Sequence, residues 1–141
     1  MHKLRSSFFY FLFPIAGGTF AAVALCFYYS RILRTRTFVF GLVALLLGLV
    51  AHLYIYSSIA QVLPAPFYLR DFLNQPRGAT ASSMMGLFIA FGHLVLMRKR
   101  DHVDVMIFIE REWPTIPNLV CCAIGGLINI ALLSGIYWIY N

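Results

Sequence analysis

The sequence predicts an all-α integral membrane protein with four transmembrane helices. Hydrophobic residues fill 61% of the 141 positions, charged residues fill only 11%, and the mean hydropathy is +0.81. A soluble domain has about 25% charged residues, so this chain lacks the charge to cover a water-facing surface. Four apolar segments, at about 8–30, 38–63, 79–97 and 119–140, contain no Asp, Glu, Lys or Arg. We expect a single membrane domain over residues 1–141.

The first two segments are each long enough to cross roughly 30 Å of hydrocarbon. In segment 8–30, Pro14 is followed closely by Gly17 and Gly18, which predicts a kink or a late start of the helix. With a late start, the residues before Pro14 would lie along the membrane interface. Segment 38–63 has 26 residues, more than the roughly 20 that a crossing needs, so we expect it to tilt.

The loops before and after segment 79–97 predict two short helices at the membrane interface. In the first loop, Pro66 and Pro76 bracket about two turns of mixed apolar and polar residues. In loop 98–118, four basic and four acidic residues surround a short apolar stretch that cannot span a bilayer. This stretch is either an amphipathic surface helix or a segment buried against another subunit. The residues expected to dock partners or lipid here are Arg98, Lys99, Arg100, Ile107, Phe108 and Trp113.

The distribution of Lys and Arg predicts an orientation. Four straight crossings would place both termini and loop 64–78 on one side, with loops 31–37 and 98–118 on the other. The first side would carry four basic residues and the second seven. Because Lys and Arg stay on the cytoplasmic side, we expect loops 31–37 and 98–118 to face the cytoplasm, or the matrix of an organelle. The membrane would be a bacterial or organellar inner membrane.

Small residues recur three or four positions apart on every predicted helix, the spacing that lets helix backbones approach closely in lipid. The selected positions are Gly18 and Ala22, Gly41 and Gly48, Ser82, Gly86 and Ala90, and Gly125 and Gly126. Four helices cannot bury all of these ridges among themselves. We therefore expect larger membrane-protein subunits, or further copies of this chain, as partners. The net charge of +6 indicates anionic phospholipids rather than nucleic acid as a further partner.

Few side chains with catalytic chemistry lie within the predicted spans. A rise of 1.5 Å per residue places His52 and Asn129 at similar depths, so we expect a structural hydrogen bond between them. His93 lies roughly 15 Å away in depth from His52, which disfavours a haem shared by both histidines within one chain. The spans also lack the carboxylates of proton-coupled carriers. The sequence therefore predicts no catalytic residue, no cofactor and no metal site.

These features favour a non-catalytic accessory subunit of a multi-subunit membrane complex. The complex would be a secretion or conjugation machine, or a respiratory or other energy-converting assembly, with partners docked through residues 98–117. One alternative is a homo-oligomeric channel or carrier in which His52, Asn129 and Gln61 line a path. A second alternative is a membrane electron-transfer or enzyme subunit that uses His52 or His93.

Overall fold

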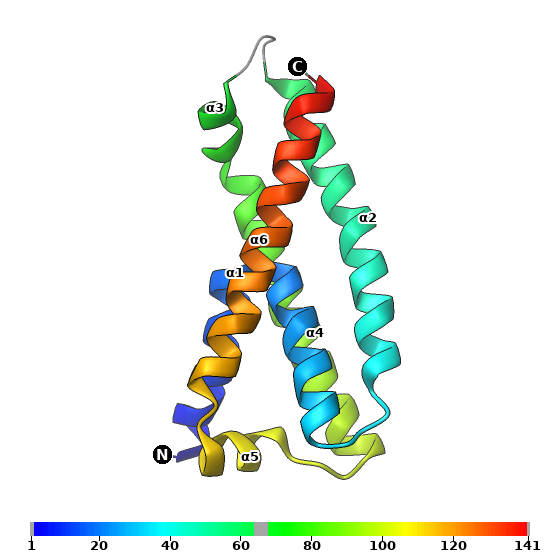
Figure 1. Ribbon diagram of the computed structural model, residues 1–141, viewed down its shortest axis with the longest axis vertical. Coiled ribbons are helices and arrows are strands. Elements are labelled where there is room, and N and C mark those ends of the chain that lie inside the picture. The colour runs from blue at the N-terminus through cyan, green and yellow to red at the C-terminus, as the bar shows by residue number, and fades with distance from the viewer. Residues whose placement is uncertain (1, 64–67, 141) are drawn as a thin grey trace.

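The computed structural model describes residues 2–63 and 68–140, and six helices cover most of them (Figure 1). The helices are α1 (His2–Ile32), α2 (Phe38–Val62), α3 (Leu69–Leu73), α4 (Pro76–Arg100), α5 (Val105–Glu112) and α6 (Thr115–Tyr140). The described residues contain no strand, and four helices, α1, α2, α4 and α6, are long and apolar enough to cross a membrane. The predicted all-α membrane fold is confirmed.

Most helix boundaries lie close to the predicted ones. Helix α2 ends one residue before the predicted limit, whereas α4 and α6 begin three and four residues earlier than predicted. Both loops hold the expected short helices, α3 and α5. Pro66 lies outside the described residues. Pro76 is the first residue of α4 rather than the end of the loop helix, because its fixed φ suits the first helical position and its missing N–H is not needed there.

Helix α1 differs from the prediction because its chain reverses direction at Gly18. Gly18 has φ 78° and ψ −157°, which breaks α1 into two half-helices. The ring centroids of Tyr10 and Tyr29 are 5.7 Å apart. A straight helix would separate these two residues by roughly 28 Å. Helix α1 is therefore a helical hairpin, as Figure 1 shows, and neither a kinked crossing nor a helix preceded by an interfacial segment.

The reversal places the start of α1 beside α5. The ring of Phe9 lies 4.3 Å from that of Trp113, and the guanidinium carbon of Arg5 lies 5.9 Å from the same indole ring. In Figure 1 the start of α1 and the end of α6 lie at opposite ends of the molecule. The prediction that both termini share one side is therefore wrong. We call the end that holds the start of α1, residues 33–37 and α5 the basic end.

The hairpin occupies only half of the molecule. The half-helices before and after Gly18 have 16 and 14 residues and rise roughly 24 Å and 21 Å, less than the roughly 30 Å of a hydrocarbon core. A large apolar core at the basic end joins both half-helices, including Phe13 and Leu25, to α4, α5 and α6. Beyond the tip of the hairpin, a smaller core joins α2, α3 and α6 around Tyr56 and Ile136.

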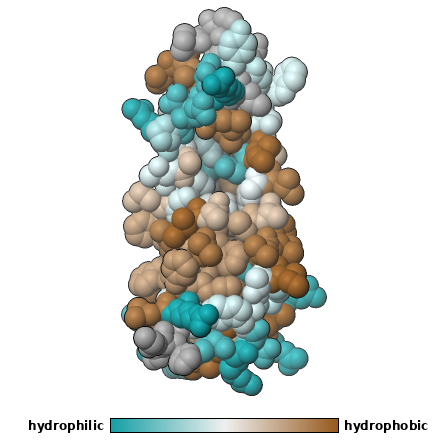
Figure 2. Space-filling model, turned by 90° about the vertical axis from the view of Figure 1, so that its left-hand side faces the viewer, coloured by the Kyte–Doolittle hydropathy of each residue, from teal (hydrophilic) through white to brown (hydrophobic). Residues whose placement is uncertain are grey.

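The outer surface matches a lipid environment. Figure 2 shows an apolar band around the middle of one face, with hydrophilic side chains gathered toward the two ends of the molecule. Large apolar side chains such as Leu46 and Val50 on α2 are exposed. Contiguous apolar surface of this kind is rare on soluble monomers and indicates contact with lipid or protein.

We predict that Gly18→Ala destabilises the fold. The φ and ψ of Gly18 lie in a region that is essentially restricted to glycine and costs other residues about 1–3 kcal/mol. A Cβ at this position would also overlap Ser82 Oγ. Thermal unfolding in mild detergent, followed by tryptophan fluorescence, should show a midpoint several degrees lower.

Gly126→Ala is the matched control for that substitution. Apart from its chain neighbours and its own helix backbone, no described atom lies within 4 Å of the position that a Cβ of Gly126 would take, so the midpoint should not fall. Equal midpoints for Gly18→Ala and the unmodified protein would contradict a reversal at Gly18.

Candidate functional site

The strongest polar feature inside the helices surrounds the tip of the α1 hairpin. His52 on α2 is only 1% exposed. Its Nδ1 lies 2.8 Å from the Gly48 carbonyl oxygen, and its Nε2 lies 3.0 Å from Ser82 Oγ on α4. The Thr19 N–H, the first after the break, donates to the same Ser82 Oγ over 3.2 Å. We call the hydrogen-bonded group of Thr19, Ser82 and His52 the reversal network.

The hydrogen bonds of α4 satisfy backbone groups on both sides of the break. Thr19 Oγ1 donates to the Ser82 carbonyl over 3.1 Å, and the neighbouring Ser83 Oγ donates to the Ile15 carbonyl over 2.8 Å. Ile15 belongs to the end of the first half-helix, whose last carbonyls have no partner within the helix. Non-helical backbone at membrane depth is tolerated where protein buries it, and these side chains supply that environment.

The geometry determines the protonation pattern of the network. A carbonyl can only accept, so His52 donates its Nδ1–H to Gly48, and Nε2 is the acceptor. Ser82 Oγ–H then donates to Nε2 while the Ser82 oxygen accepts from the Thr19 N–H. In this arrangement both ring nitrogens of the neutral His52 imidazole are occupied by hydrogen bonds within the chain.

The predicted small residues converge on the same place. A Cβ on Gly86 of α4 would lie 2.8 Å from the Gly18 carbonyl oxygen. A Cβ on Gly48 of α2 would lie 2.9 Å from the methyl carbon of Thr19. Gly125 of α6 packs against the backbone nitrogen of Ala21 so closely that a Cβ there would overlap it. Three helices therefore approach the hairpin tip through residues that lack a bulky side chain.

The remaining small residues fall into two groups. Gly41 packs against the Phe27 ring, and Ala22 and Ala90 are fully buried in the core at the basic end. Gly126 faces open space among the described residues. Most of the selected small residues therefore pack against other helices of the same chain. This corrects the inference that four helices cannot bury these ridges without partners.

The structure does not join His52 to Asn129. Among the described residues, His52 bonds to Gly48 and Ser82, while Asn129 accepts a hydrogen bond from the hydroxyl of Tyr56. The Tyr56 ring packs edge-on against the imidazole at 5.5 Å, so it lies between the two predicted partners. The expected pair is corrected to two neighbouring polar groups, His52 with Ser82 and Asn129 with Tyr56. Tyr56 lies one helical turn beyond His52 and links the two groups through its ring.

His93 belongs to a separate polar cluster near the basic end. Its Nε2 lies 3.1 Å from Ser30 Oγ and 2.9 Å from Thr37 Oγ1, and these two hydroxyls lie 2.6 Å apart. The cluster ties the end of α1 and the start of α2 to α4. The Nδ1 of His93 has no hydrogen-bond partner among the described residues. The two histidines thus lie in different networks, in line with the expected difference in depth.

Sequence reasoning missed the hydroxyl groups that complete these clusters. Tyr29 donates to Asn118 Oδ1 over 2.9 Å and ties α1 to α6, and Tyr10 donates to the Ala90 carbonyl over 3.3 Å and ties α1 to α4. Ser, Thr and Tyr are common in membrane helices, so their presence alone carries little signal. The missing information was the reversal at Gly18, which brings both tyrosines into the core.

The predicted docking residues divide into exposed and packed groups. Arg98, Lys99 and Arg100 are exposed at the end of α4, and Ile107 is exposed on α5. Phe108 instead packs against the Tyr29 ring at 5.9 Å. Trp113 packs on Phe9, as described above, and keeps part of its surface exposed. The exposed members of the group are therefore the three basic residues and Ile107, together with the outer edge of Trp113.

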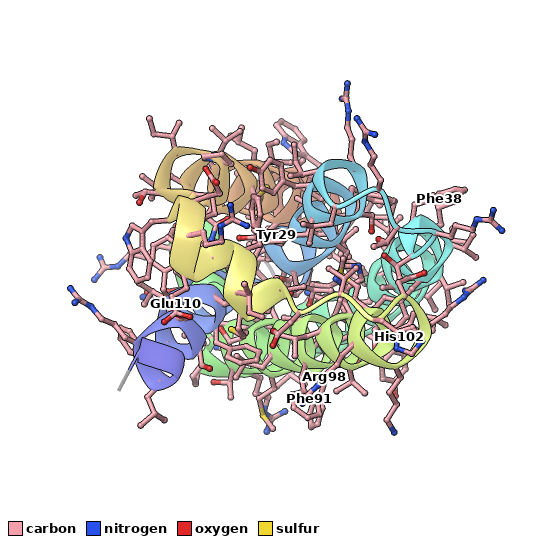
Figure 3. The ribbon with its side chains drawn as sticks, turned by 90° about the horizontal axis from the view of Figure 1, so that it is seen from below. Tyr29, Phe38, Phe91, Arg98, His102 and Glu110 are labelled. Carbon is pink, nitrogen blue, oxygen red and sulfur yellow. The ribbon has the colours of Figure 1, made fainter. Side chains whose placement is uncertain are left out.

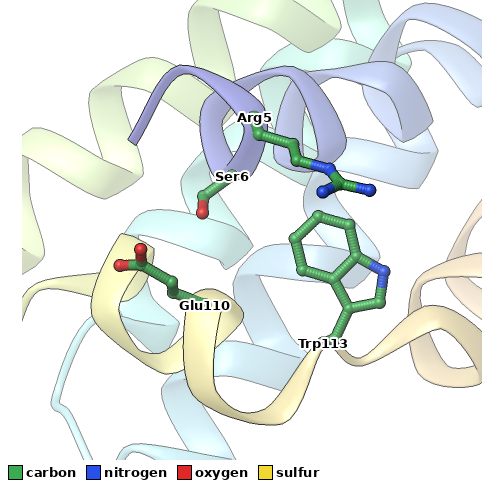
Figure 4. Close-up of a pocket in the computed structure, with 4 residues that line it drawn as sticks. All are labelled: Arg5, Ser6, Glu110 and Trp113. Carbon is green, nitrogen blue, oxygen red and sulfur yellow. The ribbon is translucent and has the colours of Figure 1, made fainter. Parts of the chain in front are cut away.

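A shallow pocket of about 260 Å³ lies where α1 meets α5 (Figure 4). Arg5 and Ser6 line it from α1, and Glu110 and Trp113 line it from α5 and the residue after it. Figure 4 shows the Arg5 side chain extended over the indole ring. A cation over a tryptophan face is stabilised by the ring quadrupole, so this contact helps to hold the first half-helix against α5.

We predict that Ser82 and His52 stabilise the fold as one unit. Ser82→Ala leaves a buried N–H of Thr19 and a buried ring nitrogen without their partner, and His52→Phe removes the ring acceptor. Each change should lower the free energy of unfolding by about 1–2 kcal/mol. The double variant should lose clearly less than the sum, because both changes remove the same hydrogen bond.

Ser58→Ala serves as the control, because Ser58 Oγ bonds only to a carbonyl one turn earlier on the exposed face of α2. It should change stability by a few tenths of a kcal/mol at most. Additive losses for Ser82→Ala and His52→Phe would contradict the reversal network.

The chain matches no protein-family model, no curated protein and no solved structure. The function is therefore argued from the polar networks, the packed tip of the hairpin and the surfaces that the fold leaves exposed.

Proposed function

We propose that the protein is a non-catalytic subunit of a larger membrane complex and that it packs against partner helices through the outer face of α6. This face consists of Leu127, Ala131, Gly135 and Trp138, which lie on one side of the helix. The observation that supports the proposal is an exposed pair of small residues, Ala131 and Gly135, beside large exposed apolar side chains. Leu127 and Trp138 are 67% and 78% exposed.

Small residues four positions apart let a second helix approach the backbone closely in lipid. Elsewhere in the chain, helices of this protein approach one another closely at Gly48, Gly86 and Gly125 around the hairpin tip. Apart from its chain neighbours and its own helix backbone, no described atom lies within 4 Å of the position that a Cβ of Gly135 would take. Helix α6 is also the least buried of the four long helices. Its outer face thus resembles the internal contacts in residue type while having no partner among the described residues.

The polar groups around His52 favour a structural role over a channel. A path through the membrane would need His52 and Asn129 to face it. His52 is instead buried with both ring nitrogens hydrogen-bonded, and Asn129 accepts from Tyr56. The non-helical backbone at Gly18 is covered by α2, α4 and α6. These groups stabilise the hairpin.

We infer that the basic end faces the cytoplasm or matrix. Nine of the eleven Lys and Arg residues belong to this end once the start of α1 is counted with it, and two, Arg70 and Arg77, belong to the other. The nine are Lys3, Arg5, Arg31, Arg34, Arg36, Arg98, Lys99, Arg100 and Arg111. Straight crossings would divide the Lys and Arg residues seven to four between the two sides. With the hairpin the division is nine to two, a strong asymmetry of the kind that sets orientation.

The proposal predicts co-purification of larger, unrelated membrane chains in fixed stoichiometry when the tagged protein is extracted in mild detergent. Gly135→Leu should abolish this co-purification, because leucine blocks the close approach of a partner helix. Its unfolding midpoint should stay unchanged, since the position is open within the chain.

Gly126→Leu, the same enlargement at an open position on the opposite side of α6, should retain the partners. Two outcomes would contradict the proposal. One is a homo-oligomer that conducts ions or solutes in liposomes, and the other is full retention of partners by Gly135→Leu.

A further inference from the structure

Helix α4 presents an outward face with an apolar groove on each side. One groove, of about 370 Å³, lies between α4 and α2 and reaches from Phe40 and Gly92 to Gly48 and Met85. The other, of about 400 Å³, lies between α4 and the first half of α1, beside Phe11. All the residues that line either groove are apolar or glycine. Phe88 lines both grooves, so its side chain forms the ridge between them.

The ridge and a basic residue share one stripe along α4. Met84, Phe88 and Phe91 follow a four–three spacing, and Arg98 comes seven residues after Phe91. Seven residues bring a helix back to nearly the same direction, with a drift of about 20°. In Figure 3, which looks along the molecule from the basic end, Arg98 and Phe91 lie on the same side of α4. Phe88 and Phe91 are 71% and 58% exposed, and Arg98 is exposed.

The depth of the grooves matches one leaflet of a bilayer. From Arg98 to Met84 the helix rises roughly 21 Å, and from Arg98 to Phe91 roughly 10 Å. Half of a bilayer with its headgroups measures about 20–22 Å. A phosphate beside Arg98 would therefore place acyl chains at the depth of the two grooves, and the chains would end near the level of Met84.

We propose that an anionic phospholipid binds across the outer face of α4, with its phosphate at Arg98 and one acyl chain in each groove. The two grooves lie at the same depth on either side of one ridge, which suits two chains that share one headgroup. Lys99 and Arg100 are also exposed at this end of α4, so three basic residues in a row precede the carboxylate of Asp101, the residue that caps the helix. Such a cluster beside a membrane helix attracts anionic headgroups.

The charge at the mouth of the grooves selects a lipid over a partner helix. A helix laid along the stripe would have to cover the exposed Arg98 guanidinium, whereas a lipid phosphate pairs with it. This site lies on α4 and is distinct from the outer face of α6. The failure of one proposal would therefore leave the other standing.

The test is native mass spectrometry of the full-length protein in detergent, with phosphatidylglycerol and phosphatidylethanolamine of identical acyl chains as probes. We expect a retained phosphatidylglycerol adduct in preference to phosphatidylethanolamine. Arg98→Gln should weaken the phosphatidylglycerol adduct roughly fivefold, the effect of about one surface charge. Arg77→Gln, which removes an exposed charge at the other end of the same helix, should leave it unchanged.

A second pair of variants tests the ridge. Phe88→Ala should weaken both lipid adducts because it removes the wall that the two grooves share. Leu46→Ala, at an exposed position on α2 outside both grooves, should not. Inorganic phosphate at millimolar concentration should not displace the lipid, since most of the contact is with the acyl chains.

Three results would overturn the proposal. They are equal effects of Arg98→Gln and Arg77→Gln, no preference between the two lipids, and displacement of the adduct by inorganic phosphate alone. All four variants replace exposed side chains, and an unchanged unfolding midpoint for each would show that the fold is intact.

Discussion

Backbone N–H and C=O groups that leave a helix inside hydrocarbon must find partners within the protein. The reversal at Gly18 creates such groups in the interior of this molecule, and the rest of the fold is arranged to satisfy them. Ser82 and Ser83 on α4 bond to the backbone on the two sides of the break. His52 on α2 in turn bonds to Ser82 and orients its hydroxyl. The buried polar group of Thr19, Ser82 and His52 is thus explained by one turn of the main chain.

The same constraint explains where glycine is needed. The hairpin tip carries carbonyl oxygens and N–H groups that side-chain hydroxyls can reach only when the neighbouring helices come very close. Gly48, Gly86 and Gly125 permit that approach from three directions. The two halves of α1 then supply most of the apolar core at the basic end. Where the hairpin ends, α2 and α6 pack through Tyr56, Asn129 and Ile136.

Much of the fold could be predicted because segment length and hydropathy determine which parts enter a bilayer. Helix α2 and both short loop helices follow the prediction closely. The reversal could not be predicted from composition, since segment 8–30 has the same residues whether it is straight or folded back. Pro14, Gly17 and Gly18 indicate a break there, but its angle depends on Ser82, which lies more than 60 residues further along the chain. The distribution of Lys and Arg was the signal that could have found it.

The sequence predicted the kind of residue at the candidate site, a buried histidine, but not the hydrogen-bond partners of that residue. His52 was correctly expected to be a buried, hydrogen-bonded residue, and depth alone suggested Asn129 as its partner. Depth does not determine direction around a helix, and Tyr56 occupies the space between them. The hydroxyls around His93 and Tyr29 depend on the hairpin, so a prediction of straight helices could not bring them together.

Cysteine accessibility in intact cells tests the central claim, the hairpin, most directly. Single cysteines at Leu4, His102 and Asn74, all exposed positions, would be labelled with a membrane-impermeant reagent before and after permeabilisation. The unmodified chain, whose three cysteines lie within helices, sets the background. The hairpin predicts that Leu4→Cys and His102→Cys react only after permeabilisation, whereas Asn74→Cys reacts from outside. Labelling of Leu4→Cys together with Asn74→Cys, and apart from His102→Cys, would show that α1 crosses the membrane and would contradict the reversal at Gly18.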